Sequence, residues 1–161
     1  MKKSILVIAL TSLLFVGCKN ESAEREKVAQ ANIDSYSKTW ELVVNEGKVN
    51  VLDTAYAPEI VLHTVPEIKG IAGAKAYYAN FVTGFSNRKF IVKDMYASGD
   101  KVTKYWQFKG THTGDFMGIP ATKKTIDVEG CTIARMVNGK IVEERDFMDN
   151  MDFMKQLGLM K

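Results

Sequence analysis

The sequence predicts an α+β domain: a curved antiparallel sheet that wraps around a long N-terminal helix to form a cone with an apolar interior. Apolar residues recur at helical spacing in the first half of the chain, whereas the period becomes two from Arg88 onward. Gly99-Asp100 and Asn138-Gly139 are tight-turn signals between the predicted strands. Helices followed by a meander of strands are typical of this class.

The first half of the chain contains the predicted helices. A long amphipathic helix begins after Glu26 and ends at Gly47. Its apolar face comprises Val28, Ile33, Tyr36, Trp40 and the pair Val43-Val44. A brief helix or turn over 51–56, a short strand over 59–65 and a second substantial helix over 71–85 follow.

The second half contains the predicted sheet. Strands are predicted over 90–98, 101–111, 124–137 and 140–147, and a short closing helix ends at Gly158. A chain of this length is sufficient for one hydrophobic core and too short for two domains.

The N-terminus has the three-part layout of a secretory signal: Lys2 and Lys3, an apolar run over 5–16, and Gly17-Cys18. The run is too short to span a bilayer. Its ending, Phe15-Val16-Gly17-Cys18, resembles the lipobox of bacterial lipoproteins, in which the cysteine receives the lipid. We therefore expect a signal peptide over 1–17, a lipidated tether over 18–26 and a domain over 27–161. A buried N-terminal helix with an incidental cysteine is the alternative.

Such an anchor would hold the protein to a membrane of the cell envelope, on the periplasmic or outer-membrane side. Loss of Lys2 and Lys3 would lower the formal net charge from +3 to +1. No basic stripe interleaved with aromatic residues remains, so nucleic acid is not an expected partner. The two histidines lie far apart without a supporting cysteine pair, and the sequence therefore predicts no metal site.

Asp146 is the main candidate for chemistry. On the last predicted strand it shares a face with Val142, Glu144 and Met148. A carboxylate among aliphatic and thioether groups loses hydration, which raises its pKa and makes it a better base near neutrality. A solvated carboxylate paired with Arg145 or a lysine is the alternative.

The stretch from Gly110-Thr111-His112 through Ile119-Pro120-Ala121-Thr122 resembles the glycine-threonine-histidine signature of the SnoaL-like polyketide cyclase, or ester cyclase, family. Further segments occur in the order that this family has them, and the likeness spans about residues 30 to 160. They are 98–102, 138–144, 156–159, His63 after a short strand and Gly70 at the start of the middle helix. The family belongs to the nuclear transport factor 2-like superfamily, whose cystatin-like fold is the cone predicted above.

The resemblance implies a chemistry. Characterised cyclases of this family close a polyketide ring by an intramolecular aldol reaction without cofactor or metal. Their acid/base aspartate on the final strand matches Asp146, and their cavity histidine on the preceding strand matches Thr132. Thr132 can donate a hydrogen bond but cannot take a proton at neutral pH. Arg145 stands where the family usually has tryptophan.

Further side chains are expected to bind the substrate, and they are His63, His112, Trp106, Met136 and Met148. The methionines could form a soft wall for an apolar ligand, or simply fill the core.

Three hypotheses follow. The first is a cofactor-independent cyclase or isomerase for a small apolar carbonyl compound, in which Asp146 abstracts a proton and Thr132, His112 or a tyrosine stabilises the enolate oxygen. The second is a non-catalytic module of the envelope that binds a small hydrophobic ligand. The third is an interaction protein that forms a homodimer through the outer face of its sheet.

Overall fold

A computed structural model describes residues 13–160, with side chains from Glu21 onward. The start of the predicted signal peptide and the side chain of Cys18 lie outside this range. Of the residues described, no helix is both long enough and apolar enough to cross a bilayer.

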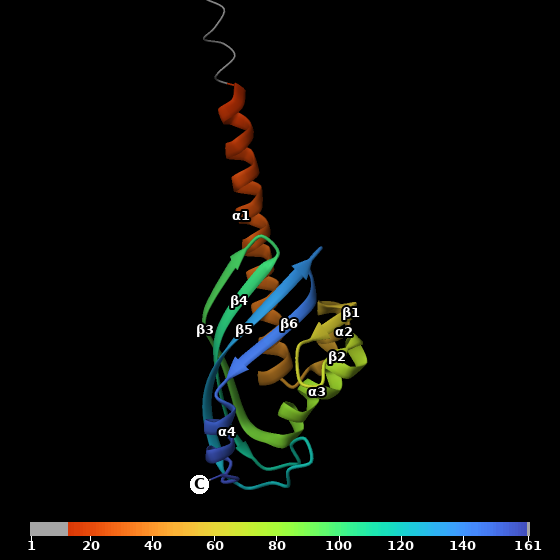
Figure 1. The fold of residues 1–161 in the computed structure, drawn as a ribbon, viewed down its shortest axis with the longest axis vertical. Helices are drawn as coiled ribbons and strands as arrows, with labels where there is room; N and C mark the ends of the chain where they lie inside the picture. The colour runs from red at the N-terminus through yellow and green to blue at the C-terminus, as the bar shows by residue number, and fades with distance from the viewer. Residues whose placement is uncertain (1–12, 161) are drawn as a thin grey trace, which may run out of the picture.

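The chain alternates helical segments and strands before it enters a long meander (Figure 1). The helical segments are α1 (Leu13–Trp40), the π-helical turn η1 (Glu41–Asn45), the 3₁₀ turn η2 (Val49–Val51), α2 (Leu52–Ala55), α3 (Gly70–Gly84) and α4 (Asn150–Gln156). The strands are β1 (Tyr56–Leu62), β2 (Ile68–Lys69), β3 (Phe85–Ser98), β4 (Lys101–His112), β5 (Thr125–Val137) and β6 (Lys140–Met148). The predicted α+β class is confirmed.

The sheet has the order β2-β1-β6-β5-β4-β3, and β3 to β6 form the expected antiparallel meander. The sheet as a whole is mixed rather than antiparallel throughout, because β1 lies parallel to β6. A period of two identifies a strand but not its partner. Since β1 and β6 are far apart in sequence, no hairpin fixes their relative direction.

One turn and one strand boundary show which features the local sequence predicts and which it does not. Asn138 and Gly139 both have positive φ, as a tight hairpin turn requires. β3 begins at Phe85, five residues earlier than predicted. Near this start, Asn87 has a φ of 50° and the pairing register shifts between Ser86 and Lys89. This irregularity hides the alternation on which the prediction depended.

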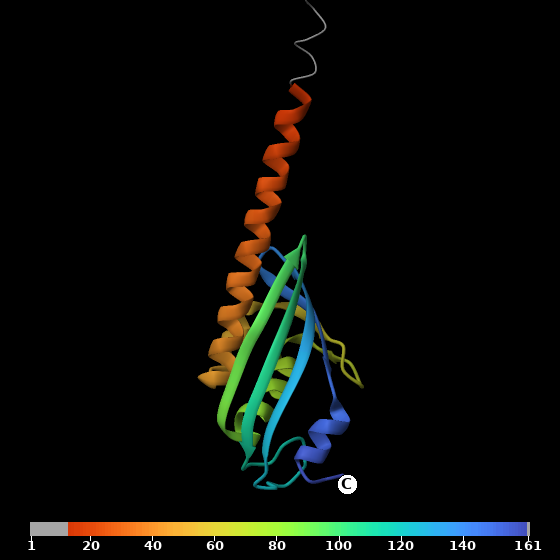
Figure 2. The same ribbon diagram turned by 90° about the vertical axis from the view of Figure 1, so that its left-hand side faces the viewer.

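The cone consists of the sheet curved around the C-terminal part of α1 and around α3, with α4 beside the lower end of β5 (Figures 1 and 2). Tyr36, Trp40 and Val43 are buried against the sheet, as predicted, but Val28 is exposed. The helix also extends through the predicted tether, since α1 begins at Leu13. Figure 2 shows this N-terminal part of α1 projecting well beyond the end of the sheet.

The inner face of β6 differs from the predicted one. Ile141 and Glu144 are both buried although they are three residues apart, because the register with β5 shifts between Arg135 and Met136. Glu144 and Asp146 still lie on the same side of the strand, as predicted. On the opposite, outer face of the sheet, Tyr105, Ile133 and Phe147 are exposed. The homodimer expected through that face remains a prediction.

Candidate active site

The wide part of the cone encloses a cavity of about 460 Å³ that opens to solvent. This volume lies in the range of small-molecule sites. Of the predicted site residues, five line the cavity, and they are His63, Trp106, Thr132, Asp146 and Met148. Most of the remaining wall is apolar or aromatic and comes from α1, α3, β3, β4 and α4.

Two predicted ligand contacts lie elsewhere. His112 is fully buried outside the cavity lining, where its ring packs against Phe85 and Phe116. Its Nδ1 accepts a hydrogen bond from the backbone N–H of Thr122 at 3.3 Å. Met136 is also a core residue that does not line the cavity. His112 is on the same inward face of β4 as the cavity-lining residue Phe108, but it lies four residues farther along the strand, where it packs among aromatic rings.

Pairing of the strands sets the centre of the site. Thr132 on β5 lies opposite Lys104 on β4 and opposite Asp146 on β6. Residues paired across neighbouring strands point to the same face of a sheet. Lys104, Thr132 and Asp146 therefore form one row across the cavity wall.

A hydrogen-bonded chain holds the aspartate in this row. The indole Nε1–H of Trp106 donates to Thr132 Oγ1 at 2.9 Å, and Thr132 Oγ1 donates to Asp146 Oδ1. The hydroxyl of Tyr78 lies 3.3 Å from the other carboxylate oxygen. Gly130 makes this arrangement possible, because a Cβ at that position would lie 2.3 Å from the Trp106 ring.

Glu144 is a second carboxyl group in the cavity, and the sequence reasoning had not assigned it a role. It is 1% exposed and accepts hydrogen bonds from the hydroxyls of Tyr36, Tyr56 and Tyr78. Burial raises the pKa of Glu144 to about 7, against the opposing charge of Lys104. The desolvated carboxyl group that we expected at Asp146 is thus found two residues earlier, whereas Asp146 retains solvent access.

Lys104 is a third ionisable group that the sequence reasoning missed. It is 2% exposed, and its Nζ lies 3.8 Å from the centre of the Trp40 ring. Burial lowers the pKa of Lys104 to about 8, and the charges of Glu144 and Asp146 limit the decrease. The signal was present in β4, where Lys104 stands between Val102 and Trp106 on the inward face.

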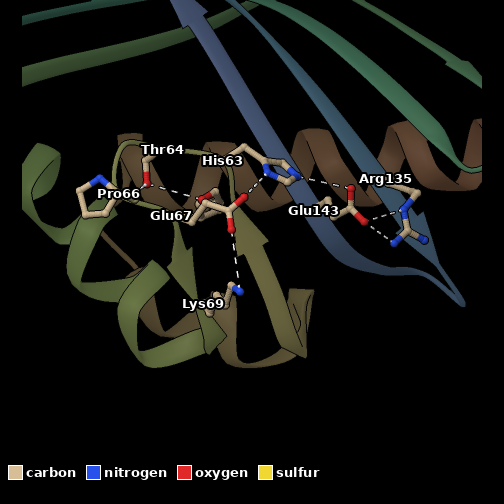
Figure 3. Close-up of polar contacts among 8 residues, drawn as sticks. His63, Thr64, Pro66, Glu67, Lys69, Arg135 and Glu143 are labelled. Atoms are coloured by element: carbon tan, nitrogen blue, oxygen red, sulfur yellow. Dashed lines mark hydrogen bonds and ion pairs between the residues drawn. The ribbon is translucent and has the colours of Figure 1, made fainter.

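His63 lies at the rim of the cavity between two carboxylates (Figure 3). Its Nδ1 is 3.0 Å from Glu67 and its Nε2 is 3.5 Å from Glu143. Glu143 is bound in turn by Arg135, which holds the pKa of that carboxyl group below its usual range. These contacts fix the imidazole at the entrance and tie the loop after β1 to β6.

No group of three or more His, Cys, Asp or Glu side chains that could hold a metal ion is found among the described residues. The ionisable groups that line the cavity are His63, Tyr77, Tyr78, Lys104, Glu144 and Asp146. Such a set can take up, hold and release protons, and can donate hydrogen bonds to an oxygen atom of a ligand.

A curved sheet around a long helix, with an apolar cavity that contains paired carboxyl groups, places the protein in the nuclear transport factor 2-like class of folds. The model of the SnoaL-like polyketide cyclase family matches residues 34–157. The chain belongs to that family.

Individual relatives agree with this assignment. The chain is 30% identical over 94 residues to aklanonic acid methyl ester cyclase DnrD of Streptomyces peucetius and to DauD of Streptomyces sp. (strain C5). These matches cover 58% of this chain but only 65% of DnrD and 58% of DauD. Of the solved structures, TsrD from Streptomyces laurentii has a TM-score of 0.74 at 25% identity, covering 81% of this chain and 97% of TsrD.

Proposed function

We propose that the protein is a cofactor-independent enzyme of cyclase or isomerase type that acts on a small apolar carbonyl compound, with Asp146 as its base. The observation that carries the proposal is the placement of Asp146 at an apolar cavity, where Thr132 and Tyr78 bind its carboxylate. Membership of the SnoaL-like family and the similarity to two ester cyclases are consistent with it.

The reaction would begin with proton abstraction. Asp146 removes a proton from the carbon beside the carbonyl group, and the electron pair of that C–H bond forms an enolate. Return of a proton at another carbon gives an isomer. Attack of the enolate carbon on a second carbonyl group of the same molecule closes a ring; the π pair of that carbonyl moves onto its oxygen, which takes the proton back from Asp146.

Deuterium exchange tests the first step without knowledge of the natural substrate. We expect the wild-type protein to accelerate deuterium incorporation beside the carbonyl group of 1-tetralone in D2O, measured by NMR. Trp40 and Trp106 both line the cavity, so their fluorescence reports binding in the same samples. If 1-tetralone binds but its deuterium exchange is no faster than in buffer, the proposed enzymatic activity is contradicted, and the non-catalytic binding module is favoured instead.

Thr132→Val is expected to slow this exchange by about 10-fold to 100-fold, because Asp146 loses a hydrogen bond to a charged group, worth about 1.5–3 kcal/mol. Trp106 Nε1 also loses its acceptor. The effect should fall on kcat rather than KM. Thr132→Ser retains the hydroxyl and should restore most of the rate; equal losses in both variants would contradict a positioning role for this oxygen.

We also propose that the protein is exported and anchored to a membrane of the cell envelope through a lipid on Cys18. The lipobox-like residues 15–18 support this. The exposed part of α1 could then act as a spacer. Of the helix residues from Glu21 onward, Asn32 is the first that is buried, and from Cys18 to Asn32 a rise of 1.5 Å per residue gives about 20 Å.

Cys18→Ser is expected to move the protein from the membrane fraction to the soluble fraction when bacterial cells are fractionated. Cys131→Ser removes the other cysteine of the chain and serves as the matched control, with no expected change. Continued membrane association of the Cys18 variant would refute the anchor.

A further inference from the structure

The reaction proposed above needs a donor for the oxygen that becomes negative, and most of the donors expected from the sequence are engaged or lie elsewhere. Thr132 has one hydroxyl hydrogen, which goes to Asp146. His112 lies outside the cavity lining. Tyr36, Tyr56 and Tyr78 donate to Glu144. Two further donors that line the cavity, Lys104 and Tyr77, are therefore the candidates to bind the ligand oxygen.

Lys104 is a cavity-lining donor whose hydrogens are not taken. The described residues include no hydrogen bond or ion pair to its Nζ, although the side chain is 98% buried. Burying a charge without an acceptor is costly. The rings of Trp40, Tyr36 and Phe90, with centres 3.8, 4.8 and 5.1 Å from Nζ, offset part of that cost by cation–π attraction.

Lys104 is placed where it can donate a hydrogen bond to the substrate oxygen while Asp146 takes the proton. Lys104 and Asp146 are the two ends of the row whose middle is Thr132. Neighbouring strands are about 4.8 Å apart, so the two backbones are separated by about 10 Å. A carbonyl compound that lies over Thr132 can present its C–H bond to the carboxylate and its oxygen to the ammonium group.

We propose that Lys104 is a catalytic residue that donates a hydrogen bond to the carbonyl oxygen of the substrate and stabilises the enolate oxygen. This inference rests on the proposed function. Asp146 takes the proton, the C–H electron pair becomes the carbon–carbon double bond, and the carbonyl π pair moves onto the oxygen. The net charge of the cavity does not change, but the negative charge moves from Asp146 towards the ammonium group.

The competing donor is the hydroxyl of Tyr77, which also lines the cavity. Burial raises the pKa of Tyr77 to about 12, so it remains a neutral donor. A charged donor makes a hydrogen bond about twice as strong as a neutral one. Burial lowers the pKa of Lys104 only to about 8, so the lysine is mostly charged at pH 7.

The test uses 4-nitrophenolate, an aromatic oxyanion that imitates the enolate, and Asp146→Asn, which imitates the protonated base. We expect this variant to bind 4-nitrophenolate at least tenfold more tightly than the double variant that also carries Lys104→Met. Binding of neutral 1-tetralone should differ by less than threefold between the two. Calorimetric titration measures both affinities. Tyr77→Phe in the same background should weaken the phenolate complex less than Lys104→Met does.

Activity provides an independent readout. With Asp146 intact, Lys104→Met should lower kcat for deuterium exchange at least tenfold and leave KM within threefold, whereas Lys101→Met, an exposed lysine of the same strand, should change neither. Lys104→Gln repeats the comparison if the methionine variant does not fold.

Several results would overturn the proposal. These are unchanged phenolate binding in the lysine variants, a larger effect of Tyr77→Phe, or equal weakening of the phenolate and 1-tetralone complexes. A Lys104 adduct with 1-tetralone that borohydride traps would indicate a nucleophile instead. If the wild type catalyses deuterium exchange and the lysine variants retain its rate, the catalytic role of Lys104 is rejected and the proposed function is not. No exchange by the wild type would reject the proposed function and the catalytic role together.

Discussion

Asp146→Asn is expected to slow deuterium exchange into 1-tetralone by about 10²–10⁴-fold, the contribution of a well-placed general base. The amide can still accept the hydrogen bond of Thr132 at its oxygen, so the geometry of the cavity should persist. It cannot take the proton. The loss should therefore appear in kcat, and the affinity for 1-tetralone, measured by tryptophan fluorescence, should change by less than threefold.

Asp100→Asn is the matched control for this experiment, because Asp100 is exposed in the turn between β3 and β4 and does not line the cavity. Its exchange rate should equal that of the wild type. Undiminished exchange in Asp146→Asn would eliminate this residue as the base. Glu144, the second carboxyl group of the cavity, would then be the group to test.

The stability of the protein is expected to depend on pH through Glu144. Its ordinary pKa is 4.5 and burial raises the pKa to about 7 in the folded protein. Between these values the folded state binds more protons than the unfolded state, so the free energy of unfolding falls as pH rises. The stabilisation is complete below about pH 4.5 and is lost above about pH 7. A difference of this size corresponds to about 3 kcal/mol.

Glu144→Gln removes this titration. We therefore expect the free energy of unfolding of the variant, relative to the wild type, to rise by about 3 kcal/mol from pH 5 to pH 8. Urea denaturation at a series of pH values measures it. Loss of the neighbouring carboxylate should also lower the pKa of Lys104 further, which acts in the same direction.

Glu129→Gln provides the control for the pH series. Hydrogen bonds from Lys93 and Tyr105 hold the pKa of Glu129 below its usual range on the outer face of β5. This group is ionised in both states above pH 5, so its variant should differ from the wild type by a constant amount. A constant difference for Glu144→Gln as well would contradict a buried, proton-binding carboxyl group.

The sequence by itself determined the class of the fold, the order of its elements and the place of Asp146 on the last strand. These properties depend on local signals: apolar spacing along a helix or strand, and turn residues such as Asn138-Gly139 whose backbone conformation is intrinsic. The side on which Thr132 and Asp146 point follows from the same alternation.

Only the tertiary structure decided that β1 lies parallel to β6, that His112 is a packing residue, and that Glu144 and Lys104 are buried in the cavity. Tyr36 and Glu144 are 108 positions apart in the chain, yet they share a hydrogen bond. A strand pattern shows that a charged side chain faces inward, but not whether distant elements supply the hydroxyls and rings that make its burial tolerable. That supply depends on how α1, α3 and the sheet pack, because the free energy of a buried charge is set by all of its neighbours.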